Sequence, residues 1–487
     1  MSQGGTRPSD DPQLLPSRFG RAVEVMGALV VVVGLLLVWL LAPTYPNYDS
    51  YYHLVWGREL RSGAVPSFEA YAAPTQHPLY VGIAAVLGLV GERADRALVG
   101  LCFVSHAALV VGAYRLGAAV FGRWSGLLGA LFVASSASFL LYAARGYVDM
   151  PFLALVVWAA VAATRPDASR VPMVLLVLAG LLRPEAWVLA GLYWLWALPR
   201  ADRAARLWLT AGVIAAPVTW ALVDLWATGD PLHSLNATSE LADDLGREQG
   251  LAAVPGAFVS FVGATVRPPV FVLALVGGLL ATRRPGLRAA RIPFALALTG
   301  VMTFVGTGVL GLAILPRYLT VPSVAFCLFA GYALAGFTTL PSGNPFRRTW
   351  TRGAVAAAAL GTIGLFLLAP SIGRVAEELR FLRATHSGLV DLLDEPRVRA
   401  AMACGPLTFP NYRLVPDARW HLDAPRERVT ARSARRRRTG VALFLTTRKG
   451  LRRYGFADGA SPSTNVPDPG FSLIARNERM AAYARCE

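Results

Sequence analysis

Charged residues are scarce in this sequence, and their scarcity indicates the solvent in which the chain folds. Only 16% of its 487 residues are Asp, Glu, Lys or Arg, whereas 55% are hydrophobic, and the mean hydropathy is +0.47. A soluble globular domain carries about 25% charged residues. The apolar residues gather in runs of about 17 to 25, the length that a helix needs to cross the hydrocarbon core. The composition therefore excludes an ordinary soluble globule and predicts an integral membrane protein.

Acidic residues are also few, 30 against 47 Lys and Arg, which gives a net charge of +17. Such an excess is typical of nucleic-acid-binding proteins, but no zinc-finger, RNA-recognition or helix-turn-helix pattern accompanies it. The arginines fall in short loops between apolar runs or in the last part of the chain. They indicate topogenic charge and attraction to anionic membrane lipids, and they predict no nucleic-acid partner.

Cysteine is rare as well, with four in the chain. Cys102 and Cys327 lie in apolar runs, whereas Cys404 and Cys486 lie in the last part of the chain. These last two would form a disulfide if that part of the chain lies in an oxidising compartment.

The apolar runs predict an all-α polytopic membrane protein of about eleven transmembrane helices. A further run, 78–90, is too short to cross and is interpreted as a juxtamembrane helix with both ends outside. The predicted helices span 22–42, 97–119, 125–142, 148–164, 171–182, 184–198, 207–226, 253–281, 292–313, 318–339 and 353–370.

This count places the Arg-rich connections on one side of the membrane, which the positive-inside rule makes cytoplasmic. We therefore expect a multi-pass protein of the cell membrane with a cytoplasmic N-terminal tail, 1–21, and a membrane domain, 22–372. The first outer loop would be 43–96. Residues 373–487 would form an extracytoplasmic domain, and their short apolar segments, separated by turn residues, predict a small α/β fold.

Two acids at the predicted outer face are the candidate catalytic residues. Asp49 lies among aromatic residues, where a carboxylate can take a hydroxyl proton and rings can stack on a sugar; an interfacial aromatic belt is the alternative. Asp149 lies at the same face and favours a shared site, although a helix N-cap explains it too. The side chains predicted to contact substrate are Tyr48, Tyr52, His53, His77, Tyr147 and Glu185.

Two arginines at this face are candidates for binding a phosphate. Arg317 precedes a helix at headgroup level, where it can bind a phosphate or snorkel to lipid. Arg183 forms either a structural turn pair with Glu185 or part of an anion-binding rim. The polar loop 227–252 either gates the substrate or connects helices.

Five motifs follow one another along the chain: the acidic motif Tyr48 to His53, His77 to Tyr80, the turn Val120 to Arg123, Val148 to Met150, and Pro316 to Leu319. This ordered set resembles the GT-C superfamily of polyprenyl-phosphate-sugar glycosyltransferases, particularly its protein O-mannosyltransferase and aminoarabinose-transferase branch. The resemblance covers residues 20–340.

The resemblance implies an enzyme that transfers a sugar from a polyprenyl-phosphate donor to a glycan, lipid or protein acceptor at the extracytoplasmic face. It implies Asp49 as the general base, Asp149 as the second acid, and Arg317, helped by Arg183, as the donor-phosphate ligands. The family often has two adjacent acids where this chain has Asp49-Ser50. A divalent metal is therefore not favoured, and no other cofactor is expected.

A lipid-linked glycan flippase or a transporter is the alternative from another class. Such a protein would show a repeat between its halves and polar residues near the bilayer midplane. The sequence shows no repeat, and its acids gather at one face, so the enzyme is the favoured interpretation.

Overall fold

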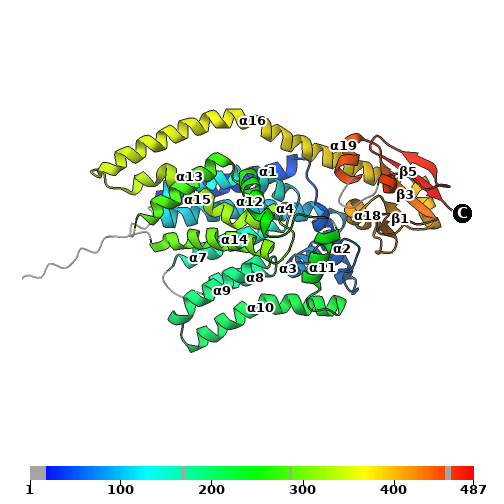
Figure 1. The fold of residues 1–487 in the computed structure, drawn as a ribbon, viewed down its shortest axis with the longest axis horizontal. Helices are drawn as coiled ribbons and strands as arrows, with labels where there is room; N and C mark the ends of the chain where they lie inside the picture. Colours follow the sequence, from blue (N-terminus) through cyan, green and yellow to red (C-terminus); the bar gives the residue numbers. More distant parts are fainter. Residues whose placement is uncertain (1–17, 166–169, 245, 285–287, 456–461) are drawn as a thin grey trace, which may run out of the picture.

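A bundle of helices and a small sheet domain beyond one end of it make up the molecule (Figure 1). The computed structural model describes residues 18–165, 170–244, 246–284, 288–455 and 462–487. Helix α16, Pro345–Asp394, runs along the bundle and ends in the sheet domain (Figure 1). The predicted fold class, an all-α membrane part with a small C-terminal α/β domain, is confirmed.

Apolar side chains cover the outside of the bundle as well as its core. In the first helix, for example, Val25 is 64% and Leu37 is 50% exposed. Such surfaces are unfavourable in water but match lipid tails. The elements of the membrane part are α1 Arg18–Leu41, α2 Tyr48–Arg61, α3 Pro78–Leu87, η1 Gly88–Arg93, α4 Ala94–Phe121, α5 Arg123–Ala134, α6 Ala137–Ala144, α7 Asp149–Ala163, α8 Arg170–Gly180, α9 Glu185–Ala197, α10 Arg203–Thr228, α11 His233–Asp244, α12 Val254–Thr265, α13 Pro268–Thr282, α14 Arg291–Val309, η5 Pro316–Leu319 and α15 Thr320–Ala335.

Helices long enough to cross a bilayer are present throughout the bundle. Within the described ranges, five pass by length and composition, or seven if each of two bent pairs is one span. Helices α7 and α8 are apolar but shorter. The chain is therefore a multi-pass membrane protein, and the count of about eleven spans stays a prediction.

Two of the predicted helices are broken. The run 125–142 consists of α5 and α6, bent by 55°, and the run 253–281 consists of α12 and α13, bent by 102°. At the second break Arg267 has a φ of +67° and Pro268 begins the next helix. A proline has no N–H to continue the ladder of the preceding helix, and apolar periodicity alone does not reveal such bends.

Another correction joins two segments that the sequence analysis separated. The predicted span 353–370 and the amphipathic stretch after it, 375–393, form one continuous helix, α16. The hydrophobic pattern changes there from an apolar run to an amphipathic one, but the backbone continues through residue 373. The predicted domain boundary therefore falls inside a helix.

The C-terminal domain contains a mixed five-stranded sheet in the order β2-β1-β3-β5-β4. Strand β1 pairs in parallel with β2 and β3, whereas β5 pairs antiparallel with β3 and β4. Strand β3 is buried along its whole length, as its continuous apolar run requires. The elements are β1 Leu407–Phe409, α18 Val415–Leu422, β2 Val429–Ala431, β3 Gly440–Leu445, β4 Ser472–Arg476 and β5 Met480–Arg485.

A disulfide closes this domain. It joins Cys404 and Cys486, which are 82 residues apart in sequence and 4.9 Å apart between Cα atoms, so the predicted pairing is confirmed. Closing a loop of this length removes about 4 to 5 kcal/mol of conformational entropy from the unfolded chain in the loop-closure model. Cys102 and Cys327 are buried free thiols.

Candidate active site

Helix α2 carries Asp49 in its first turn, and its start is fixed by a side-chain cap. The Asn47 carboxamide oxygen accepts hydrogen bonds from the backbone N–H groups of Asp49, at 2.7 Å, and Ser50, at 3.2 Å. An N-cap of this type stabilises a helix by about 1 kcal/mol. Asp49 lies in the first turn of this helix, two residues after the cap.

A second set of bonds ties α2 to the turn between α6 and α7. The backbone N–H and the Nδ2 of Asn47 both donate to the Arg145 carbonyl, at 2.7 and 3.0 Å. The Gly146 carbonyl accepts from the hydroxyls of Ser50, at 2.5 Å, and Tyr80, at 2.6 Å. The two acidic motifs, distant in sequence, are thereby held side by side.

The predicted base and the predicted phosphate ligand are in direct contact. Nη1 of Arg317, in η5, donates to Oδ2 of Asp49 at 3.1 Å. Both side chains are 25% exposed. The Nε of Arg317 is buried without a hydrogen-bond partner. Asp49 and Arg317 therefore form an open ion pair that still has a free N–H donor.

Arg183 is bound on two sides by carboxylates. It donates to Asp149 and to Glu185, and its own side chain is 4% exposed. Asp149 is fully buried and Glu185 is 13% exposed. The rings of Phe152 and Tyr318 lie 5.4 and 5.6 Å from the guanidinium carbon. The predicted pair of Arg183 with Glu185 is thus present, with Asp149 as a third member.

The alternative explanation of Asp149 as a helix N-cap was wrong. Val148 holds the cap position of α7, and no side chain caps that end. Asp149 is instead the first residue of the helix, and its carboxylate meets Arg183.

Two predicted substrate contacts, Tyr48 and Tyr147, are half-buried near Asp49. The Tyr48 hydroxyl donates to the Ala72 carbonyl, and its ring lies 5.1 Å from that of Tyr52. Burial, and then the nearby Asp49 carboxylate, raise the pKa of the Tyr147 phenol. Both phenols are therefore neutral at physiological pH and present aromatic faces.

Three other predicted contacts are buried: Tyr52, His53 and His77. The two imidazole rings stack, with centroids 5.1 Å apart and planes at 17°. Burial lowers the pKa of His53 to about 4. The ring is therefore neutral, and because a carbonyl only accepts, its Nδ1 carries the hydrogen that it donates to the Asp49 backbone oxygen at 2.5 Å. His53 thus supports the first turn of α2 from within.

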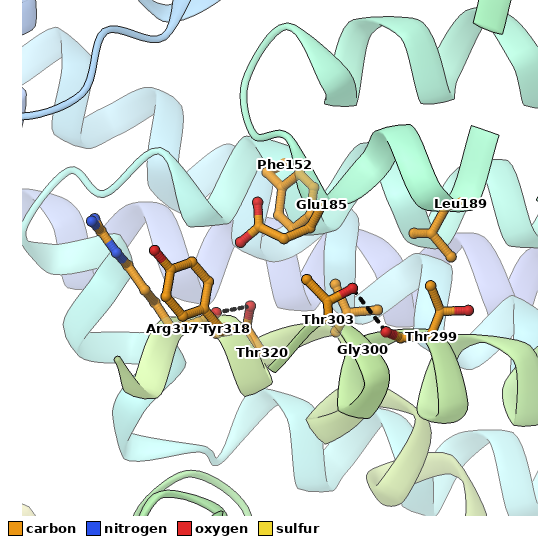
Figure 2. A pocket seen from close by; sticks show the side chains of 10 residues that line it. Phe152, Glu185, Leu189, Thr299, Gly300, Thr303, Arg317, Tyr318 and Thr320 are labelled. Atoms are coloured by element: carbon orange, nitrogen blue, oxygen red, sulfur yellow. Dashed lines mark hydrogen bonds between the residues drawn. The ribbon is translucent and has the colours of Figure 1, made fainter. Parts of the chain in front are cut away.

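A cavity extends from the ion pairs into the bundle between α9, α14 and α15 (Figure 2). Figure 2 shows Arg317 and Tyr318 at one end, Leu189 and Thr299 at the other, and Glu185 between them. The lining residues are Phe152, Glu185, Leu189, Thr299, Gly300, Thr303, Arg317, Tyr318, Thr320 and Val321.

Two of the threonine hydroxyls of this cavity bind backbone carbonyls. That of Thr303 donates to the Thr299 carbonyl at 2.9 Å, and that of Thr320 donates to the Arg317 carbonyl at 2.8 Å. Because these two donors are already used, the cavity presents mainly apolar surface. Its charged groups are Arg317 at one end and Glu185 between the ends (Figure 2).

The C-terminal domain holds the other end of α2. Arg58 donates to the carbonyls of Arg419, at 2.8 Å, and Trp420, at 2.9 Å, and pairs with Asp423 at 2.8 Å. The buried guanidinium of Arg419 in turn pairs with Glu59 at 2.7 Å. Since the helix is fixed at both ends, the position of Asp49 depends on the C-terminal domain as well as on the bundle.

The outer loop 227–252 is fastened to the first outer loop. The buried Asp224 accepts from the N–H and hydroxyl of Ser234, at 2.9 and 2.8 Å, and from Gln76 at 3.2 Å. The hydroxyls of Thr75 and Thr238 are 2.7 Å apart. The loop is therefore tied to the first outer loop, and both predicted roles, a gate for substrate or a connection between helices, stay predictions.

The likeness to known proteins lies in the fold rather than in the sequence. No family model matches the chain, and no curated protein matches it. The structure of ArnT from Cupriavidus metallidurans bound to undecaprenyl phosphate matches with a TM-score of 0.57 and 15% identity, over 96% of this chain and 98% of that one. The chain has the GT-C fold.

Two further structures extend this GT-C likeness. ArnT in the apo state matches with a TM-score of 0.52 and 15% identity, over 94% of this chain and 98% of that one. A more distant structure is the Archaeoglobus fulgidus oligosaccharyltransferase AglB, in complex with an inhibitory peptide and a dolichol-phosphate, with a TM-score of 0.48 and 12% identity over 85% and 65%. The two ArnT structures confirm the GT-C fold expected from the order of the motifs.

The sequence analysis missed the residues that position Asp49 within this GT-C fold. They are Asn47, Ser50 and Arg145 at one end of α2, and Arg58 and Arg419 at the other. Asn47 could have been found, because Asn ahead of an acid in the first helical turn is a typical N-cap signal. The others depend on contacts between distant segments.

Proposed function

We propose that the protein is a membrane glycosyltransferase that moves a sugar from a polyprenyl-phosphate donor to an acceptor hydroxyl at the extracytoplasmic face. The observation that carries the proposal is the partly exposed contact of Asp49 with Arg317 beside a small, mainly apolar cavity of the bundle. A lipid phosphate requires a cation for its headgroup next to apolar surface for its chain. ArnT, which has the same fold, binds undecaprenyl phosphate.

The donor phosphate would bind at Arg317. Its partly exposed guanidinium has Asp49 as its carboxylate partner, and the Tyr318 ring lies at the same end of the cavity (Figure 2). Arg183, the second predicted ligand, is bound by two carboxylates. It would therefore hold the two acids in place and would not bind the phosphate directly.

The acceptor hydroxyl would give its proton to the Asp49 carboxylate. As its oxygen bonds to the anomeric carbon of the sugar, the bond from that carbon to the phosphate oxygen breaks, and the electron pair stays on the phosphate. Arg317 stabilises the charge that develops there. Tyr48 and Tyr147 would flank the sugar, Glu185 would face it from the cavity, and the buried Tyr52, His53 and His77 would support α2.

The disulfide supports an extracytoplasmic site. It lies in the domain that adjoins α2 and α3 at one end of the bundle (Figure 1). Disulfides persist in oxidising compartments, so this end would face the outside and the N-terminal tail the cytoplasm.

The test is sugar transfer by the purified protein in detergent. Protein, a polyprenyl-phosphate-linked sugar and a cell-envelope acceptor fraction would be incubated, and the products would be analysed by mass spectrometry. We expect glycosylated acceptor and released polyprenyl phosphate with the wild type, and neither with Asp49→Asn. A flippase moves lipids between the two leaflets of a bilayer, and detergent removes the bilayer. If the wild type transfers no sugar to any acceptor fraction but translocates lipid in vesicles, the protein is the transporter instead.

A further inference from the structure

The two arginines of the site differ in how many carboxylates they bind. Arg183 lies between Asp149 and Glu185, whereas Arg317 has a single carboxylate partner, Asp49. Three acids therefore face two guanidinium groups. Arg317 is the one whose side chain is partly exposed, so it is the cation that a phosphate can reach.

No other guanidinium among the described residues lines the cavity. Arg145, close to the same turn, stacks on the ring of Tyr45 at 3.9 Å and faces the C-terminal domain through it. A phosphate that approaches this end of the cavity therefore meets Arg317, which already holds Asp49.

We propose that the Asp49–Arg317 ion pair masks the catalytic base until the donor phosphate binds, so that the donor binds before the acceptor reacts. The inference rests on the proposed function. A carboxylate and a phosphate that share one guanidinium each receive less of its charge and repel one another. Because Asp49 is partly exposed, its carboxylate can turn away when the phosphate takes Arg317.

The same exchange resets the site. Before donor binding, Asp49 is an ion-pair partner and is not offered to a hydroxyl. With the phosphate on Arg317, the carboxylate is free to take the acceptor proton, and transfer leaves it protonated beside the lipid phosphate. When the lipid phosphate departs, Arg317 returns to Asp49, and the proton leaves to water as the ion pair forms again.

The test is the affinity of the purified, full-length protein for undecaprenyl phosphate, which lacks the sugar and so reports binding alone. Four proteins would be compared: wild type, Asp49→Asn, Arg317→Gln and the double variant. If Arg317 is free of Asp49 in about one molecule in ten, Asp49→Asn binds the lipid about tenfold more tightly than the wild type. In the Arg317→Gln background, Asp49→Asn brings no gain in affinity for the lipid, because the guanidinium for which Asp49 and the phosphate compete is absent.

Each remaining outcome decides against one of the two proposals. Unchanged or weaker binding by Asp49→Asn overturns the masking, and so does a gain that persists in the Arg317→Gln background, which would be a general field effect. A folded wild type that does not bind undecaprenyl phosphate overturns the proposed function itself. Asp49→Ser, which removes the same charge with a shorter side chain, repeats the comparison if Asp49→Asn melts early.

Discussion

Two arginine–carboxylate groups occupy the end of the bundle that adjoins the sheet domain, and they differ in burial and in composition. The closed group, Asp149, Arg183 and Glu185, is buried and has two acids for one base. The open pair, Asp49 and Arg317, is one-quarter exposed and has one acid for one base. A guanidinium that is fully bound and buried has nothing left to offer a ligand, whereas one that is half bound can exchange partners. The same residue types are therefore expected to serve structure in the closed group and, under the proposed function, chemistry in the open pair.

The largest expected effect is loss of the fold when Arg183 is removed from the closed group. Arg183→Gln leaves the buried Asp149 carboxylate without a counter-charge, which costs about 3 to 5 kcal/mol. We expect little folded protein, measured as yield and thermal melting in detergent. Arg317→Gln is the matched control, because breaking a partly exposed pair costs about 1 kcal/mol or less. Equal melting temperatures of the two variants would show that the closed group and the open pair do not differ in their contribution to stability.

The next effect is on turnover in the open pair. Asp49→Asn keeps the size of the side chain but cannot accept a proton, so sugar transfer falls at least about a hundredfold while the fold is retained. The matched change in the closed group, Asp149→Asn, is expected to lower the melting temperature more than it lowers turnover. Near wild-type turnover of Asp49→Asn in the purified transfer assay would show that Asp49 is not the base.

A smaller effect is expected on lipid binding. Arg317→Gln removes a charge-assisted ligand of the phosphate and weakens undecaprenyl phosphate binding about 10- to 100-fold. Arg317→Lys keeps the charge without the two-pronged geometry and is expected to restore part of the affinity. If Arg317→Gln binds as tightly as the wild type, the arginine only reaches to surrounding lipid headgroups.

The smallest effect concerns the residue where the two groups meet. Glu185 pairs with Arg183 but also lines the cavity, and Asp149 still neutralises Arg183 without it. We expect Glu185→Gln to change both melting and turnover modestly, by less than about 1.5 kcal/mol, the weight of one ordinary hydrogen bond. A loss of turnover as large as that of Asp49→Asn would place Glu185 in the reaction.

Periodicity and charge were sufficient for the fold class and for the face on which each acid and arginine lies. They could not pair Asp49 with Arg317, which are 268 residues apart, because the pairing depends on how η5 packs against α2. They could pair Arg183 with Glu185, two residues apart, but not with Asp149. The burial of His53 was also hidden, because a short helix of mixed composition does not reveal which side faces the bundle.

Helix α16 determines the angle at which the sheet domain is held relative to the bundle. Its 50 residues form one continuous helix that spans about 75 Å if straight, at about 1.5 Å per residue. One inserted residue would turn the sheet domain by about 100° about the helix axis and carry Arg419 away from Glu59. Seven residues, almost two turns, would return the domain to nearly the same angle but would move it by about 10 Å along the helix axis. The contacts of the sheet domain with α2 therefore fix the length of this helix as well as its angle.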